Sequence, residues 1–128
     1  MKNILITVLI TTFISACTKH AGDYEEPTPA ATLIISQPLY NRTLSSTDSV
    51  RVVATAIASA VIHGYDVYIT RQNDTSRLQS FSVHDHNDTL MIDKKFSPLP
   101  MAGYEAHVTL KLDHDGNTLH KFVPFKTE

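Results

Sequence analysis

Seven histidines are the side chains of this sequence best suited to chemistry. His84 and His86 flank a single aspartate, so in an extended segment their imidazoles project to the same side. His114 lies in another polar segment, between two aspartates. Imidazole is a preferred ligand of zinc and copper. One hypothesis is therefore a zinc or copper site formed by His84, His86 and His114.

The same segments also have a purely structural interpretation. Asp, Asn and His are frequent in turns, because they tolerate unusual backbone angles and form local hydrogen bonds. Residues 113–117 resemble part of a calcium loop but lack its third carboxylate position and its distal Glu. A hairpin turn at Asp115 and Gly116 is the better interpretation of that segment. His63 falls on an apolar face, where a histidine is more often a hydrogen-bonded core or rim residue.

Composition and motifs exclude several functional classes. Eleven Lys and Arg against 13 Asp and Glu give a net charge of -2, which argues against a nucleic-acid binder. The single cysteine excludes an internal disulfide and a zinc site made of several thiolates. The sequence has no Gly-x-Ser-x-Gly elbow, glycine-rich phosphate loop or His-Glu-x-x-His motif. We therefore expect no enzyme and no cofactor other than the metal of the hypothesis above.

Tyr68 is a candidate for partner binding. It falls on the polar face of a predicted strand, where its ring could stack on a sugar or on a protein. Single exposed tyrosines are also common on surfaces that bind nothing.

A two-residue alternation of apolar and polar side chains predicts the elements that position these residues. It indicates about seven short strands, the fourth at a sheet edge, and no helix in the folded part, as in an all-β, antiparallel β-sandwich. In the usual strand order of such a sandwich, three connections meet at one end, with His63, His84, His86, His114 and His120 at or near it. The predicted strands cover residues 33–35, 49–58, 60–71, 78–83, 89–96, 104–112 and 118–125.

The first residues have the pattern of an export signal. Lys2 precedes the apolar residues 4–13, a run too short to span a bilayer comfortably. Residues 14–17, Ile-Ser-Ala-Cys, resemble the bacterial lipobox, which implies that Cys17 is lipidated and becomes the mature N-terminus. The alternative is an ordinary signal peptide that is cut nearby. We expect a signal peptide over 1–16, the lipidated cysteine and a flexible tether over 17–31, and one domain over 32–128.

The residue after the cysteine bears on location. Thr18 stands where an aspartate would resemble an inner-membrane retention signal, so we expect the outer membrane. Both a periplasmic and a cell-surface orientation remain open.

Residues 100–104 resemble the tyrosine corner of fibronectin type III and immunoglobulin-like domains, in which a proline precedes the corner tyrosine by four residues. Leu99 adjoins Pro100, whereas the family places its leucine two positions before the proline. With the signal, the domain is similar to small Gram-negative lipoproteins that carry one such domain of unknown function. The resemblance implies a sandwich and no catalytic residue. We expect a membrane-anchored, non-catalytic binding or assembly module for a protein or glycan partner, with metal binding as the alternative.

Overall fold

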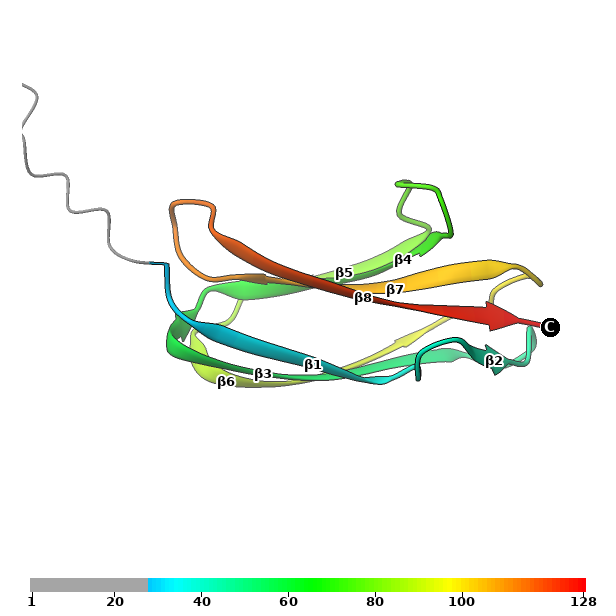
Figure 1. The fold of residues 1–128 in the computed structure, drawn as a ribbon, viewed down its shortest axis with the longest axis horizontal. Helices are drawn as coiled ribbons and strands as arrows, with labels where there is room; N and C mark the ends of the chain where they lie inside the picture. The colour runs from blue at the N-terminus through cyan, green and yellow to red at the C-terminus, as the bar shows by residue number, and fades with distance from the viewer. Residues whose placement is uncertain (1–27) are drawn as a thin grey trace, which may run out of the picture.

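The alternation of apolar and polar residues produces eight strands within residues 28–128, the part of the chain that the computed structural model describes (Figure 1). The predicted signal peptide over 1–16, Cys17 and most of the predicted tether lie outside the described residues. No helix among residues 28–128 has the length and apolar character needed to cross a bilayer. The strands are β1 (Ala31–Gln37), β2 (Arg42–Leu44), β3 (Val50–Ile62), β4 (Gly64–Arg71), β5 (Gln79–Val83), β6 (Asn87–Phe96), β7 (Gly103–Lys111) and β8 (Thr118–Thr127).

The strands form two facing sheets, so the predicted sandwich is confirmed (Figure 1). One sheet has the order β1-β3-β6 and the other β2-β8-β7-β4-β5. The fourth predicted strand, now β5, is at a sheet edge as expected. Buried side chains of both sheets meet between the layers, with Phe96 from one sheet and Tyr104 and Phe125 from the other among the largest.

The structure adds one strand to those predicted and corrects one boundary. β2 lies in a segment for which the sequence predicted no strand, and it pairs in parallel with the end of β8, from Arg42 opposite Phe125 to Leu44 opposite Thr127. A strand of three residues is too short to show an alternation, so only the pairing reveals it. The residues from Ala60 to Ile62 belong to β3 and not to the following strand, because the chain reverses at His63.

The predicted tyrosine corner is present. The Tyr104 hydroxyl donates a hydrogen bond to the Pro100 carbonyl at 2.7 Å. The Thr127 hydroxyl donates to the same oxygen at 2.6 Å, and it accepts a hydrogen bond from the Ala102 amide at 3.1 Å. These contacts join the connection before β7 to the end of β8, and they hold the buried Tyr104 ring in the core.

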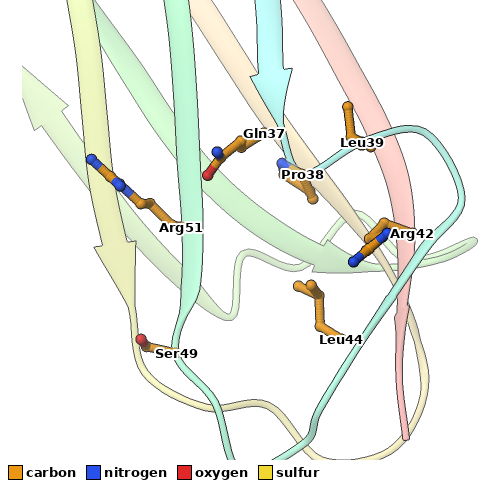
Figure 2. A pocket seen from close by; sticks show the side chains of 7 residues that line it. All are labelled: Gln37, Pro38, Leu39, Arg42, Leu44, Ser49 and Arg51. Atoms are coloured by element: carbon orange, nitrogen blue, oxygen red, sulfur yellow. The ribbon is translucent and has the colours of Figure 1, made fainter.

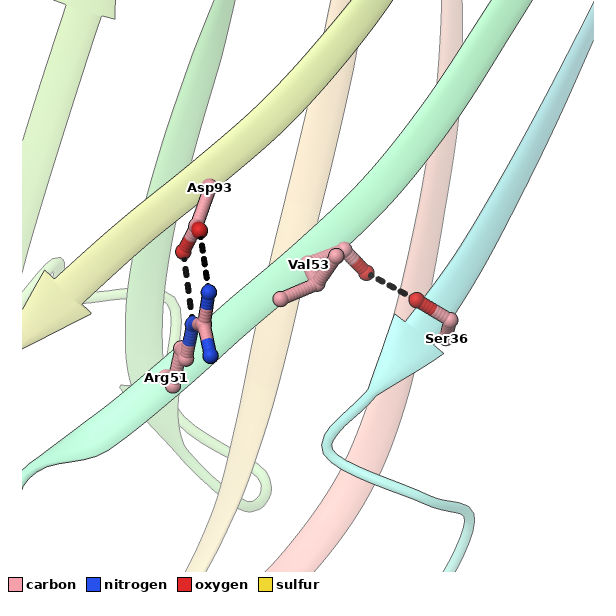
Figure 3. Close-up of polar contacts among 4 residues, drawn as sticks. All are labelled: Ser36, Arg51, Val53 and Asp93. Atoms are coloured by element: carbon pink, nitrogen blue, oxygen red, sulfur yellow. Dashed lines mark hydrogen bonds and ion pairs between the residues drawn. The ribbon is translucent and has the colours of Figure 1, made fainter.

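Polar contacts also cross the outer face of the three-stranded sheet (Figure 3). Arg51 on β3 donates from Nε and Nη2 to the two carboxylate oxygens of Asp93 on β6, at 2.8 and 2.5 Å. The Ser36 hydroxyl on β1 donates to the Val53 carbonyl at 3.2 Å, where the pairing of β1 with β3 shifts register. Side chains therefore reinforce both strand pairs of this sheet.

Candidate functional site

Four imidazoles gather at the end of the sandwich where the connections β3-β4, β5-β6 and β7-β8 meet. We call His63, His84, His86 and His114 the histidine pole. The centre of the His63 ring is 4.1 Å from that of His114 and 5.3 Å from that of His86. The His84 and His86 rings are 4.5 Å apart, almost perpendicular to one another. The structure thus brings the three predicted metal ligands together around His63, which the sequence treated as a core or rim residue.

A glycine permits the approach of two of these connections. Gly64 has φ of +135°, a conformation that other residues rarely adopt. A Cβ atom at this position would lie only 2.4 Å from the Val83 carbonyl oxygen and 3.2 Å from the His84 Cα. Because Gly64 lacks that atom, the β5-β6 connection packs directly against the start of β4, which brings His84 next to His63.

Asp85 organises the connection that carries His84 and His86. Its carboxylate accepts hydrogen bonds from the His86 amide at 2.7 Å and from the Asn87 side chain. Nε2 of His84 then lies 2.8 Å from Nε2 of His86, within hydrogen-bonding distance. The sequence predicted that these two imidazoles lie on the same side, because the histidines are two residues apart in an extended segment.

Asp113 organises the hairpin that carries His114. Its carboxylate accepts hydrogen bonds from the Asp115 amide at 3.0 Å, the Asn117 amide at 3.0 Å and the Asn117 side chain at 2.6 Å. The bonds from Asn117 hold the pKa of Asp113 below its usual range. Gly116 has φ of +93°, as a tight turn requires. The hairpin interpretation is therefore confirmed, and this carboxylate serves the turn.

His63 is the electrostatically unusual member of the histidine pole. Burial, followed by the neighbouring imidazoles of His114, His86 and His84, lowers its pKa. Among residues 28–128, its Nδ1 is the one buried side-chain nitrogen or oxygen without a hydrogen-bond partner. An open hollow of about 390 Å³ adjoins it and is also lined by His84, His114 and Lys111.

The predicted partner-binding residue Tyr68 belongs to a second group of rings, on the outer face of the five-stranded sheet. We call Tyr68, Arg77, His107 and Phe122 the aromatic surface. The Tyr68 ring stacks on the His107 ring, with centres 4.7 Å apart, and the Arg77 guanidinium carbon lies 4.0 Å from the Tyr68 ring centre. The His107 and Phe122 rings are 5.4 Å apart.

His120 was predicted at or near the histidine pole and is not there, and His107 is more buried than its predicted outward position suggests. His120 lies beside the aromatic surface and not at the histidine pole, with its Nε2 3.0 Å from Nδ1 of His107. His107 does point outward, but neighbouring rings cover it and leave it 8% exposed. Burial, then His120 and Arg77, lower its pKa from 6.5 to about 4. The Glu105 carboxylate lies 3.4 Å from Nε2 of His107, whereas the Thr70 hydroxyl is at 3.0 Å.

A further hollow of about 330 Å³ lies beside β2, away from the histidine pole (Figure 2). Its apolar lining comes from Pro38, Leu39 and Leu44, and two arginines, Arg42 and Arg51, flank it. The ion pair with Asp93 already occupies the Arg51 guanidinium. The sequence singled out none of these residues, because they come from separate segments, the end of β1 and the connection after it, β2, and the start of β3.

Comparison with known proteins identifies the fold. No family model matches this sequence, and no curated protein matches it. A solved structure of fibronectin(III)-like modules of Clostridium thermocellum CbhA superposes with a TM-score of 0.55 at 13% identity, over 75% of this chain and 94% of that one. An engineered protein superposes with a TM-score of 0.58 at 13% identity, over 77% of this chain, which spans 20% of that protein's length. The likeness shows a fibronectin III-like β-sandwich.

The histidine pole has no ready-made metal geometry. Within residues 28–128, no three His, Cys, Asp or Glu side chains are disposed so that they could hold a metal ion as they stand. His84, His86 and His114 instead contact one another or His63 through ring packing and a hydrogen bond between imidazoles.

Proposed function

We propose that this chain is an outer-membrane lipoprotein whose domain acts by binding a protein partner and not by catalysis. Cys17, at the end of residues that resemble a lipobox, supplies the anchor. Several acyl chains, each contributing about 0.8 kcal/mol per buried CH₂, would hold it stably in a membrane. The polar residues that follow would serve as a tether.

The aromatic surface is the observation that carries the binding role. It combines a tyrosine, an arginine, a histidine and a phenylalanine on one sheet face, and Phe122 is 51% exposed. Aromatic and arginine side chains are enriched at protein interfaces, where a few of them supply most of the binding free energy. Stacking of Tyr68 on His107 holds these groups in fixed positions, which lowers the conformational entropy lost on binding.

The same contacts favour a protein over a glycan. A sugar that stacks on Tyr68 would need an open ring face, and this ring already contacts His107 and Arg77. Phe122 offers an apolar side chain beside charged and polar groups, as a protein interface requires.

The anchor is tested by the fate of Cys17. Cys17→Ala removes the acyl-accepting thiol, so we expect the variant to lose the lipid modification while the domain keeps its fold. Mass spectrometry of the intact protein checks the modification, and flotation of membranes checks its location. A change in mass that equals the Cys-to-Ala replacement alone, together with unaltered flotation, would contradict a lipid anchor at this residue.

The surface is tested by photo-crosslinking in cells of the source organism. A photoreactive phenylalanine analogue at Phe122 is expected to give a defined protein adduct. The matched control places the analogue at Met91, which is 76% exposed on the outer face of the opposite sheet and should give none. Equal adducts from both positions, or adducts with glycan alone, would contradict a protein partner on the aromatic surface.

A further inference from the structure

We infer that the histidine pole is a binding site for a single divalent transition metal ion, copper or zinc, with His63 as the central ligand and His84, His86 and His114 around it. This inference is independent of the lipid anchor and of the aromatic surface, since it uses none of their side chains. It extends the hypothesis from the sequence by one residue, His63.

The donor set selects the metal. All four groups are imidazoles, which suit copper and zinc and are poor ligands for magnesium or calcium. The two nearest organising carboxylates, Asp85 and Asp113, already accept hydrogen bonds from their own connections. Lys111 is the one lysine that borders the hollow, and its Nζ lies 3.2 Å from Oδ1 of Asp66. This ion pair offsets the positive charge of the lysine. The site therefore offers only nitrogen ligands, which suit a soft or borderline metal ion.

The two imidazoles of the β5-β6 connection are close to chelating distance. Their Nε2 atoms are 2.8 Å apart. A tetrahedral ion with bonds of about 2.0–2.1 Å holds two ligand nitrogens about 3.3 Å apart. Replacing the hydrogen bond by a metal therefore requires an opening of about half an ångström. Both side chains are exposed, so their rings have room to turn.

His63 supplies the second argument. Its Nδ1 is buried without a hydrogen-bond partner, and a bound metal ion would satisfy this nitrogen. The His63 amide donates to the Lys111 carbonyl at 2.7 Å, so its backbone is held while the exposed His84, His86 and His114 can adjust.

Paramagnetic copper tests the location of the ion. The full chain in detergent is titrated with Cu²⁺ while the imidazole signals are followed by NMR. We expect the signals of the four members of the histidine pole to broaden first, with those of His107 and His120 retained as internal references. Uniform broadening of all histidine signals would overturn the site.

Calorimetry with Zn²⁺ tests the ligands one by one. His63→Ala, His84→Ala and His114→Ala are each expected to weaken binding at least about tenfold. Asp115→Ala is the matched control, because Asp115 adjoins His114 in the same turn and its substitution removes no imidazole, and the affinity of this variant should equal that of the unsubstituted chain. His84 and His114 are exposed, so their variants keep the fold, which circular dichroism verifies. Undiminished Zn²⁺ affinity in both of these variants would overturn the proposal, as would the absence of heat with the unsubstituted chain.

Discussion

The hydroxyl of Tyr104 takes part in a contact that joins two parts of the chain distant in sequence. It shares the Pro100 carbonyl with the hydroxyl of Thr127, so one oxygen accepts from the start of β7 and from the end of β8. The ring itself is fully buried and stacks near Phe125, with centres 5.7 Å apart. The contribution of the hydroxyl can therefore be separated from that of the ring.

Tyr104→Phe should lower the free energy of unfolding by about 1 kcal/mol, the typical net value of one hydrogen bond. The loss stays small because Thr127 still donates to the Pro100 carbonyl. Urea denaturation measures it. Tyr40→Phe, at a ring that is 75% exposed, serves as the matched control and should leave stability unchanged. Equal stability of both variants would mean that the corner hydroxyl does not contribute.

His107 should make stability depend on pH. Its pKa of about 4 in the folded protein lies below the ordinary 6.5, so folding favours the neutral ring. This contribution is fully present above pH 6.5 and is lost as the pH falls towards 4. The slope in that window is at most about 1.4 kcal/mol per pH unit.

The contribution of His107 is isolated by comparison with His107→Gln, which cannot take up a proton. Urea denaturation of both proteins from pH 7 to pH 4 is expected to show a steeper loss for the unsubstituted chain. His63 and the carboxylates titrate in both proteins, so their effects cancel in the difference. Parallel curves would show that His107 is not held neutral by the fold.

Some of these residues were predictable from local sequence and others were not. Pro100 and Tyr104 are four residues apart, and His84 and His86 share one side of an extended segment, so short spacing was sufficient for both. His107 and Phe122 meet only because β7 and β8 pair in one register. The pairing register of β7 and β8 cannot be derived from a single sequence. The burial of His107 by the neighbouring rings was therefore not predicted.

At the level of elements, the connections decide the geometry of the histidine pole. Gly64 allows β4 to begin immediately after β3, and its missing side chain makes room for the Val83 carbonyl. The alternation predicted strands on both sides of this point but not the reversal at His63. Alternation reports which face a residue occupies, whereas the reversal depends on the backbone conformation of one glycine.

Gly64→Ala should destabilise the domain by more than the strain of a positive φ alone, which is about 1–2 kcal/mol. The added Cβ would lie 2.4 Å from the Val83 carbonyl oxygen and force the β5-β6 connection outward. Gly116→Ala is the matched control, because Gly116 also has positive φ but nothing within 4 Å of an added Cβ. Urea denaturation of both variants measures the difference. Equal losses would show that the close approach adds nothing to the backbone strain.

For the whole molecule, the order of strands explains why the histidine pole was foreseen. In a sandwich, alternate connections meet at one end, so residues 63, 84, 86 and 114 could be placed together without knowing any contact. The aromatic surface could not be predicted from the order of strands alone. Tyr68, His107 and Phe122 lie on three adjacent strands, and the pairing register of these strands sets their relative positions. β2 escaped prediction for the same reason.

The direction of the first and last strands has a mechanical consequence. β1 begins at the end that carries the histidine pole, and β8 ends at the other (Figure 1). A pulling force applied at Ala31 and Thr127 would therefore act at opposite ends of the domain and along the strands. Ladder hydrogen bonds lie across the strands, so such a pull shears many of them together instead of peeling them one by one. A domain tethered at one end and held by a partner would resist stretching in this direction.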